Sequence, residues 1–237
     1  MDEAVTASDR TSVDQELATA QKYGLYWAES MMEDEHGEFL ADGCYLYRPS
    51  RFWEPFWILF QKLGQLNDYC FNQLVASEGK LRELQFQRKL ADEDDTAGAE
   101  ASAYYSEAVP FWEENVATFT KAVPLVLLAS FAEWGLKHIA INLCGCVPKK
   151  TDRSKSDIEF LLFYLVSAGI SVSEPEKLLA PIGSFREVRN NFAHGKWALL
   201  TDELRAIGLR DAFVSVSNLF EAIEEAAWRS AYGASSP

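Results

Sequence analysis

The sequence predicts an all-α protein, a helical bundle with an additional helical region on its N-terminal side. Three observations predict this class. Apolar residues make up 48% of the 237 residues, which is enough for a buried core. Several segments repeat apolar side chains with the three-to-four-residue period of a helix. No segment combines β-branched alternation with the turn residues of a hairpin.

The first part of the chain is acidic. Residues 1–14 are polar and are expected to be disordered, and residues 15–90 form an acidic helical N-terminal region. Its clearest helix follows Arg51 and carries the apolar stripe Phe52, Phe56, Leu59, Leu63, Leu66, Tyr69, Phe71 and Leu74. Pro55 fits the first turn of that helix, where a missing N–H costs nothing. A polar helix is expected to follow over residues 79–90.

Residues 91–103 (ADEDDTAGAEASA) are small, acidic and low in complexity. Such a composition is typical of a linker, because it offers little apolar surface to bury. We therefore predict an acidic linker here, and a domain boundary between the N-terminal region and the rest of the chain.

Residues 104–230 are predicted to form the main helical bundle, followed by a tail at 231–237. The expected helices cover residues 104–121, 123–143, 157–168, 175 onward and 201–228. Ser184 and Glu187 have the spacing of a capping box, which predicts a new helix start at that point. Gly195 is a plausible helix stop.

Targeting and membrane segments are not expected. The N-terminus is acidic and polar where a signal peptide is basic and then apolar. The longest charge-free apolar stretches, residues 122–132 and 160–173, are shorter than the roughly 20 residues that span a bilayer. The four cysteines are scattered and do not form a disulfide framework. We expect a cytoplasmic protein that makes no membrane contact.

The net charge argues against nucleic acid at first sight, since 22 basic residues face 36 acidic ones for a formal charge of −14. The distribution changes this interpretation. Residues 1–100 carry 9 basic and 20 acidic groups, a net −11, whereas residues 101–237 carry 13 and 16, a net −3. Local basic clusters in the second part can therefore still hold phosphates.

Two clusters have both a functional and a structural interpretation. Cys144 and Cys146, with His138 six residues before them, suggest a metal site, but a structural zinc needs four ligands in two spaced pairs. Core or loop cysteines are the better interpretation, and we expect neither metal nor cofactor. Trp53 and Trp57 could stack on bases, yet aromatics at helical spacing more often belong to a core.

The segment 184–197 (SFREVRNNFAHGKW) carries the most informative cluster. On a regular helix Arg186, Asn190 and His194 share one polar stripe, whereas Arg189 lies about 140° from His194. Histidine is the side chain that changes charge near neutral pH, and arginine holds anionic oxygens bidentately. This combination suits acid–base chemistry on a phosphodiester.

The run Arg189-Asn190-Asn191-Phe192-Ala193-His194 resembles the R-N-polar-x-x-H form of the Rx4–6H motif of the HEPN superfamily (higher eukaryotes and prokaryotes nucleotide-binding domain). Residues 125–137 (LVLLASFAEWGLK) are similar to an earlier helix of that superfamily, an apolar run with one acidic residue, here Glu133. The resemblance covers residues 104–230. It implies an up-and-down helical bundle that dimerises and, in many members, a metal-independent endoribonuclease of toxin, phage-defence or RNA-processing systems.

The resemblance implies a role for each matching residue. His194 would be the general base or acid, Arg189 would stabilise charge on the scissile phosphate, and Asn190 would orient phosphate or imidazole. Glu133 would be a supporting residue. Further substrate contacts are expected from Arg186, Asn191, Lys149, Lys150, Arg153 and Lys155, although the last four, which form a basic loop, could equally be a solvated connector.

The 140° separation favours a composite site at a homodimer interface, with Phe185, Phe192 and Trp197 as apolar material for that interface. RNA is the expected substrate, and an antitoxin or other protein partner is possible. In members regulated by AMP transfer the motif continues to a tyrosine, but this chain has Lys196 there, so that regulation is not expected.

Two alternatives stay open. Arg189 could simply pair with Glu133 or Glu187 while His194 caps a helix end. The chain could also be a non-catalytic HEPN-type module that binds a nucleotide or a protein, which its acidic first 100 residues favour.

Overall fold

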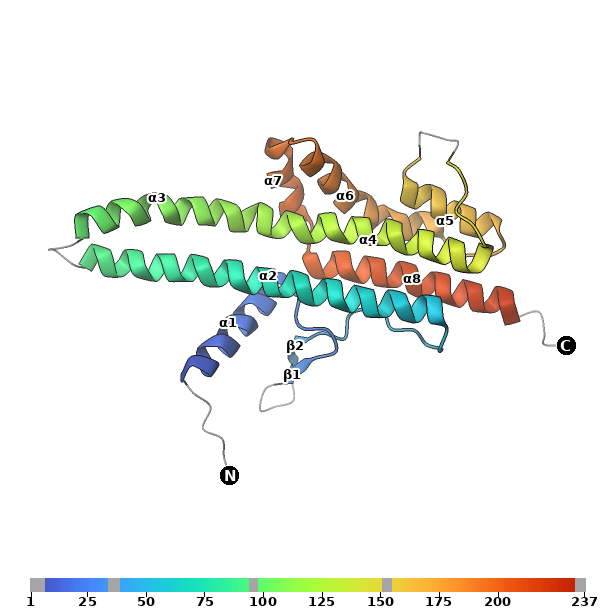
Figure 1. Cartoon of the computed structure of the whole chain (residues 1–237), viewed down its shortest axis with the longest axis horizontal. Helices are drawn as coiled ribbons and strands as arrows, with labels where there is room; N and C mark the ends of the chain where they lie inside the picture. The colour runs from blue at the N-terminus through green and yellow to red at the C-terminus, as the bar shows by residue number, and fades with distance from the viewer. Residues whose placement is uncertain (1–6, 34–38, 94–97, 151–154, 233–237) are drawn as a thin grey trace, which may run out of the picture.

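The computed structural model describes residues 7–33, 39–93, 98–150 and 155–232, and they form a helical bundle (Figure 1). The all-α prediction is confirmed. The helices are α1 (Ala7–Tyr23), α2 (Glu54–Glu93), α3 (Gly98–Ala117), α4 (Phe119–Cys144), α5 (Asp157–Ser167), α6 (Pro175–Ala193), α7 (Trp197–Ala206) and α8 (Leu209–Tyr232). Among the described residues the one sheet is an antiparallel pair of β1 (Met31–Glu33) and β2 (Phe39–Asp42), which the sequence did not predict.

The longest element is α2, whose 40 residues span about 60 Å at the helical rise of 1.5 Å per residue. It merges the apolar helix expected after Arg51 with the polar helix expected at 79–90. The helices α3 and α4 follow each other end to end and run alongside α2 (Figure 1). The far ends of α2 and α3 form a two-helix arm that extends beyond the rest of the bundle.

The predicted linker at residues 91–103 is wrong for the part that the structure describes. Residues 91–93 end α2, and residues 98–103 begin α3. The alanines of this segment favour a helix, and the two helices pack on each other through a small core of Leu81, Leu84, Val109 and Val116. The described parts of this segment therefore belong to the two packed helices, and residues 94–97 lie outside the described part.

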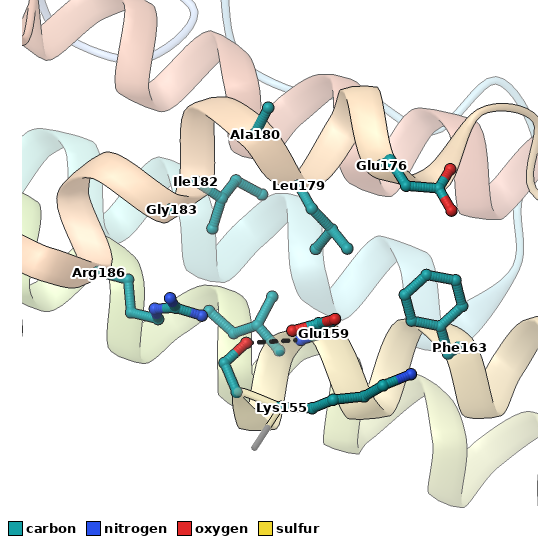
Figure 2. A pocket seen from close by; sticks show the side chains of 11 residues that line it. Lys155, Glu159, Phe163, Glu176, Leu179, Ala180, Ile182, Gly183 and Arg186 are labelled. Carbon is teal, nitrogen blue, oxygen red and sulfur yellow. Dashed lines mark hydrogen bonds between the residues drawn. The ribbon is translucent and has the colours of Figure 1, made fainter.

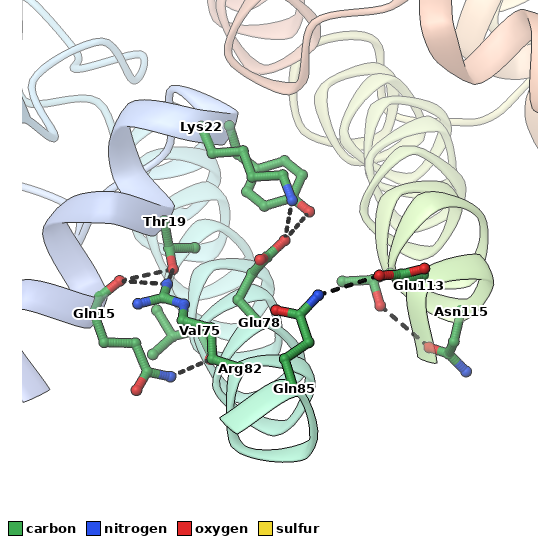
Figure 3. Close-up of polar contacts among 11 residues, drawn as sticks. Gln15, Thr19, Lys22, Val75, Glu78, Arg82, Gln85, Glu113 and Asn115 are labelled. Atoms are coloured by element: carbon green, nitrogen blue, oxygen red, sulfur yellow. Dashed lines mark hydrogen bonds and ion pairs between the residues drawn. The ribbon is translucent and has the colours of Figure 1, made fainter. Parts of the chain in front are cut away.

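Helix α1 is joined to α2 by polar contacts (Figure 3). Gln15 Nε2 donates to the Val75 carbonyl at 2.8 Å, and Lys22 Nζ lies 2.6 Å from Glu78 Oε1. Glu78 also accepts a 2.5 Å hydrogen bond from the Tyr23 hydroxyl. The disorder expected for residues 1–14 is thus wrong from Ala7 onward, because α1 begins there. Residues 1–6 lie outside the described part.

A single core unites the N-terminal region with the bundle. Phe56 and Phe71 of α2 are buried in the same cluster as Leu125 of α4 and Phe213 and Phe220 of α8. The predicted boundary between an N-terminal region and a separate bundle at 104–230 is therefore wrong, since α2 supplies a wall of that bundle.

Two further predicted helix boundaries in the second half of the chain are wrong. Helix α6 runs unbroken through Ser184, so no new helix starts there; Ile182, Phe185 and Val188 keep its buried face continuous. The helix expected at 201–228 is divided into α7 and α8 by extended backbone at Ile207. Residues 231 and 232 of the predicted tail belong to α8, and residues 233–237 lie outside the described part.

By length and composition the stretch Ala99–Cys144 is apolar enough to cross a membrane, with a mean hydropathy of 1.4 in one window. Its α4 part contributes Leu125, Leu128, Leu136 and Ile139 to the core, each without exposed surface. In the apolar window 44% of the residues are buried inside the bundle.

Candidate functional site

Helix α6 carries the RNNFAH segment and ends with it. Pro175 opens the helix, where its fixed φ suits the first turn, and His194 is the C-terminal cap. The amide of His194 donates to the Asn190 carbonyl at 3.0 Å. Gly195 then takes a φ of 65°, a conformation that glycine adopts without strain. The helix stop expected at Gly195 is confirmed.

Arg189 faces α4 and pairs with Glu133. Its Nη1 lies 3.0 Å from Glu133 Oε2, while Lys137 Nζ lies 2.5 Å from Glu133 Oε1. Burial works to raise the pKa of Glu133, but the hydrogen bonds from Lys137 and Arg189 outweigh it and hold that pKa below its ordinary value. The arginine is fixed by this carboxylate and keeps 36% of its side chain exposed.

A surface pocket of about 430 Å³ lies beside this pair, between α4, α5 and α6. Three cationic side chains line it, together with Asn190, two carboxylates and the first turn of α5: Arg186, Arg189, Lys155, Glu133, Asp157 and Ser156. Both carboxylates are already hydrogen-bonded to cations, Glu133 as above and Asp157 to Lys150 Nζ at 2.6 Å. That hydrogen bond lowers the pKa of Asp157.

The polar stripe predicted for α6 is therefore only partly present at the pocket. Arg186 and Asn190 line it, and Arg189 joins them from the side that faces α4. His194 is exposed at the helix end and is not part of the lining. Asn191, expected to contact substrate, instead donates from Nδ2 to Glu203 Oε1 of α7 at 2.7 Å.

The basic loop contributes unevenly. Lys155 lines the pocket, and Lys150 reaches its edge through the ion pair with Asp157. Lys149 is exposed and lines a neighbouring pocket, one that also includes Lys155. Arg153 lies outside the described residues.

An aromatic cluster covers the end of α6. The rings of Phe192 and Trp197 lie 5.3 Å apart, and Phe119 of α4 contacts both at 6.0 and 5.1 Å. Trp197 remains 49% exposed and Phe119 43% exposed. Phe185, which the sequence grouped with the interface aromatics, is instead buried in the core. The sequence indicated Trp197 as a member of this aromatic cluster, but nothing in the sequence pointed to Phe119.

The structure also shows the surroundings of Cys146 and Trp53, which belong to the two clusters that had both a functional and a structural interpretation. Cys146 Sγ lies 3.5 Å from the Tyr164 hydroxyl, and the described residues contain no group of three or more possible metal ligands. Trp53 packs on Phe56 and Trp228 with centroid distances of 5.3 and 6.2 Å. These contacts favour the structural interpretation of that tryptophan.

Comparison with protein-family models, with curated proteins and with solved structures finds no match for this chain. The chemistry of the pocket must therefore be argued from its own residues.

Proposed function

We propose that the protein is a metal-independent endoribonuclease of the toxin or defence type, acting on RNA in the cytoplasm as a homodimer. The observation that supports this most directly is the pocket beside the RNNFAH segment. Arg186, Arg189 and Lys155 supply positive charge there, and Asn190 adds an amide donor. Charge-assisted hydrogen bonds from such groups are the strongest that a phosphodiester can receive.

The reaction needs no reactant beyond the RNA itself. The oxygen of a 2′-hydroxyl forms a bond to the adjacent phosphorus, and the bond from phosphorus to the 5′-oxygen of the next nucleotide breaks. The imidazole of His194 carries one of the two proton transfers, from the attacking hydroxyl or to the leaving oxygen, and water carries the other. Arg189 and Arg186 stabilise the charge that builds on the phosphate oxygens. The products are a 2′,3′-cyclic phosphate end and a 5′-hydroxyl end.

The positions of Arg189 and His194 support the proposed homodimer. Arg189 is held toward α4 by Glu133, while His194 is exposed beyond the last turn of α6. A second copy that places its own α6 end against this one brings an imidazole to each pocket. The exposed ring of Trp197 beside His194 supplies apolar surface for that contact, as interface cores favour aromatics.

The test is RNA cleavage by the purified protein in excess EDTA. We expect cleavage that leaves 2′,3′-cyclic phosphate ends and falls by about 10²–10⁴-fold in the variants His194→Ala and Arg189→Ala. Lys196→Ala is the matched control, because it removes a neighbouring exposed cation outside the pocket lining. Cleavage that both site variants retain, or that EDTA abolishes, overturns the proposal.

The composite site has its own test in mixed dimers. Arg189→Ala and His194→Ala proteins, each inactive alone, should regain activity when mixed if one pocket draws its arginine and histidine from different subunits. An active monomer at assay concentration contradicts the composite site.

The pair between Arg189 and Glu133 favours one other candidate, a non-catalytic module of the same fold that binds a nucleotide or a protein such as an antitoxin. In that case the arginine is a structural partner of α4. Nucleotide or partner binding without any RNA cleavage is the outcome that identifies this second candidate.

A further inference from the structure

We call the pocket beside Arg189 the phosphate pocket, after the ligand proposed for it. A second pocket of about 440 Å³ continues from it along the groove between α5 and α6. The two pockets share Lys155, Ser156, Ile158 and Arg186 in their walls, so they form one continuous groove. Figure 2 shows Arg186 toward one end of this second pocket and Phe163 with Glu176 toward the other. We call this second pocket the α5–α6 groove.

The walls of the α5–α6 groove suit a flat aromatic ligand. Phe163 presents its ring from α5, and Lys155 Nζ lies 4.6 Å from the centre of that ring. Leu179 and Ile182 line the groove from α6. A nucleobase stacked on a phenylalanine gains about 1–3 kcal/mol whatever its identity. The stack alone therefore accounts for binding of a base and not for the choice among bases.

Two carboxylates supply the selectivity. Glu159 and Glu176 both line the α5–α6 groove, and neither has an ion-pair partner among the described residues. An ionised carboxylate only accepts hydrogen bonds, and its two oxygens accept two parallel N–H donors best. Adenine and cytosine offer one amino group beside a ring nitrogen acceptor, and uracil offers one imino group between two carbonyls. Guanine alone presents an imino and an amino donor side by side.

We propose that the α5–α6 groove is a guanine-binding subsite for the nucleotide whose phosphate occupies the neighbouring pocket. The proposal rests on the proposed action on RNA and adds its base preference. The seven residues from Ser156 to Phe163 place the ring about 10 Å along α5 from the phosphate end. Arg186 lies toward the phosphate end of the groove and Glu176 toward the other end (Figure 2), which matches a nucleotide with an anionic phosphate and a donor edge on its base.

The test is equilibrium binding of mononucleotides to the full-length protein by titration calorimetry. We expect GMP to bind at least tenfold more tightly than IMP, which lacks only the exocyclic amino group, and than AMP. Phe163→Leu should weaken all three, because it removes the stacking ring. The double variant Glu159→Gln/Glu176→Gln should bring GMP and IMP to similar affinity, because a glutamine amide no longer accepts at both positions.

Glu187→Gln is the matched control, since Glu187 is an exposed carboxylate of α6 outside the groove. It should leave the preference for GMP unchanged. Equal affinity of the wild-type protein for the three nucleotides overturns the subsite, as does a preference that survives the double variant. RNA cleavage in EDTA is scored separately. Cleavage without any guanine preference refutes the subsite alone, and a guanine preference without cleavage refutes the proposed nuclease alone.

Discussion

The interaction between Glu133 and Arg189 is the most informative one to perturb, because it joins the motif helix α6 to α4. We consider a double-mutant cycle with Glu133→Gln and Arg189→Met. Glutamine keeps the size of the carboxylate while removing its charge, and methionine keeps much of the arginine stem. The coupling free energy between the two changes isolates the pair from the second cation that Glu133 holds, Lys137.

The expected size follows from distance and exposure. Two unit charges 3.0 Å apart attract by about 1.4 kcal/mol in bulk water and by about 5.5 kcal/mol at an effective dielectric constant of 20. The guanidinium is more than one-third exposed, so water screens the pair and the lower limit is the better guide. After the entropy of holding the arginine is subtracted, we expect a coupling of about 0.5–1 kcal/mol toward folding.

Urea unfolding of the four proteins at pH 7 measures this coupling. The pKa of Glu133 is lowered in the folded protein, so the stabilisation is complete above the unfolded value of about 4.3. It is lost as the pH falls through the lower folded pKa, and the coupling should shrink accordingly in acid. A second double-mutant cycle, with Glu133→Gln and Lys137→Met, gives the coupling of Glu133 to its other cation for comparison. A coupling below about 0.3 kcal/mol at pH 7 would refute the reasoning, and so would one that acid leaves unchanged.

Four other changes test the packing, one buried hydrogen bond and the charged surface. Gly135→Ala places a methyl carbon 2.4 Å from an aromatic carbon of α8, and should lower the unfolding free energy by about 1–3 kcal/mol in urea melts. Gly183→Ala, with open space at the added carbon, should instead raise it by about 0.5–1 kcal/mol, and equal effects contradict the packing argument. Tyr47→Phe removes a 2.8 Å donor to the buried Glu224 and should cost about 1.5–3 kcal/mol, so a loss under 0.5 kcal/mol contradicts it. Lys149→Glu should weaken RNA binding and flatten its salt dependence, and an unaltered slope leaves this residue a solvated connector.

Helical periodicity predicted the fold class because the buried faces are long and regular. It failed where a local signal competed with tertiary packing. Gly79 does not end α2, which continues through it. A side-chain carbon at this position would lie 2.0 Å from Gln15 Nε2 of α1. Glycine there leaves room for the end of the Gln15 side chain, which donates to the Val75 carbonyl. The capping signal at Ser184 likewise has no effect within α6, because the buried face continues through that residue.

Part of the candidate site was also visible in the sequence. Spacing placed Arg186 and Asn190 on one stripe, and both line the pocket beside Arg189. The contact between Arg189 and Glu133, by contrast, joins residues 56 positions apart. The sequence could only name it as one of two alternatives. Phe163 and Glu176 gave no signal, because the groove between them exists only once α5 packs beside α6.

The arrangement of the helices also bears on how a chain with a formal charge of −14 can hold RNA. At 0.1 M salt, exposed charges more than about 10 Å apart are largely screened from each other. The acidic arm formed by the far ends of α2 and α3 points away from α5, and α2 alone is 40 residues long (Figure 1). Glu114, the last acidic residue of α3, precedes Glu133 of the pocket by 19 residues along the end-to-end helices α3 and α4, which is about 28 Å at 1.5 Å per residue and more than two screening lengths. A phosphate at that pocket meets chiefly the charges that line it, the cations Arg186 and Arg189 and the cation-paired carboxylates Glu133 and Asp157. The total charge of the chain is therefore a poor guide to its ligand.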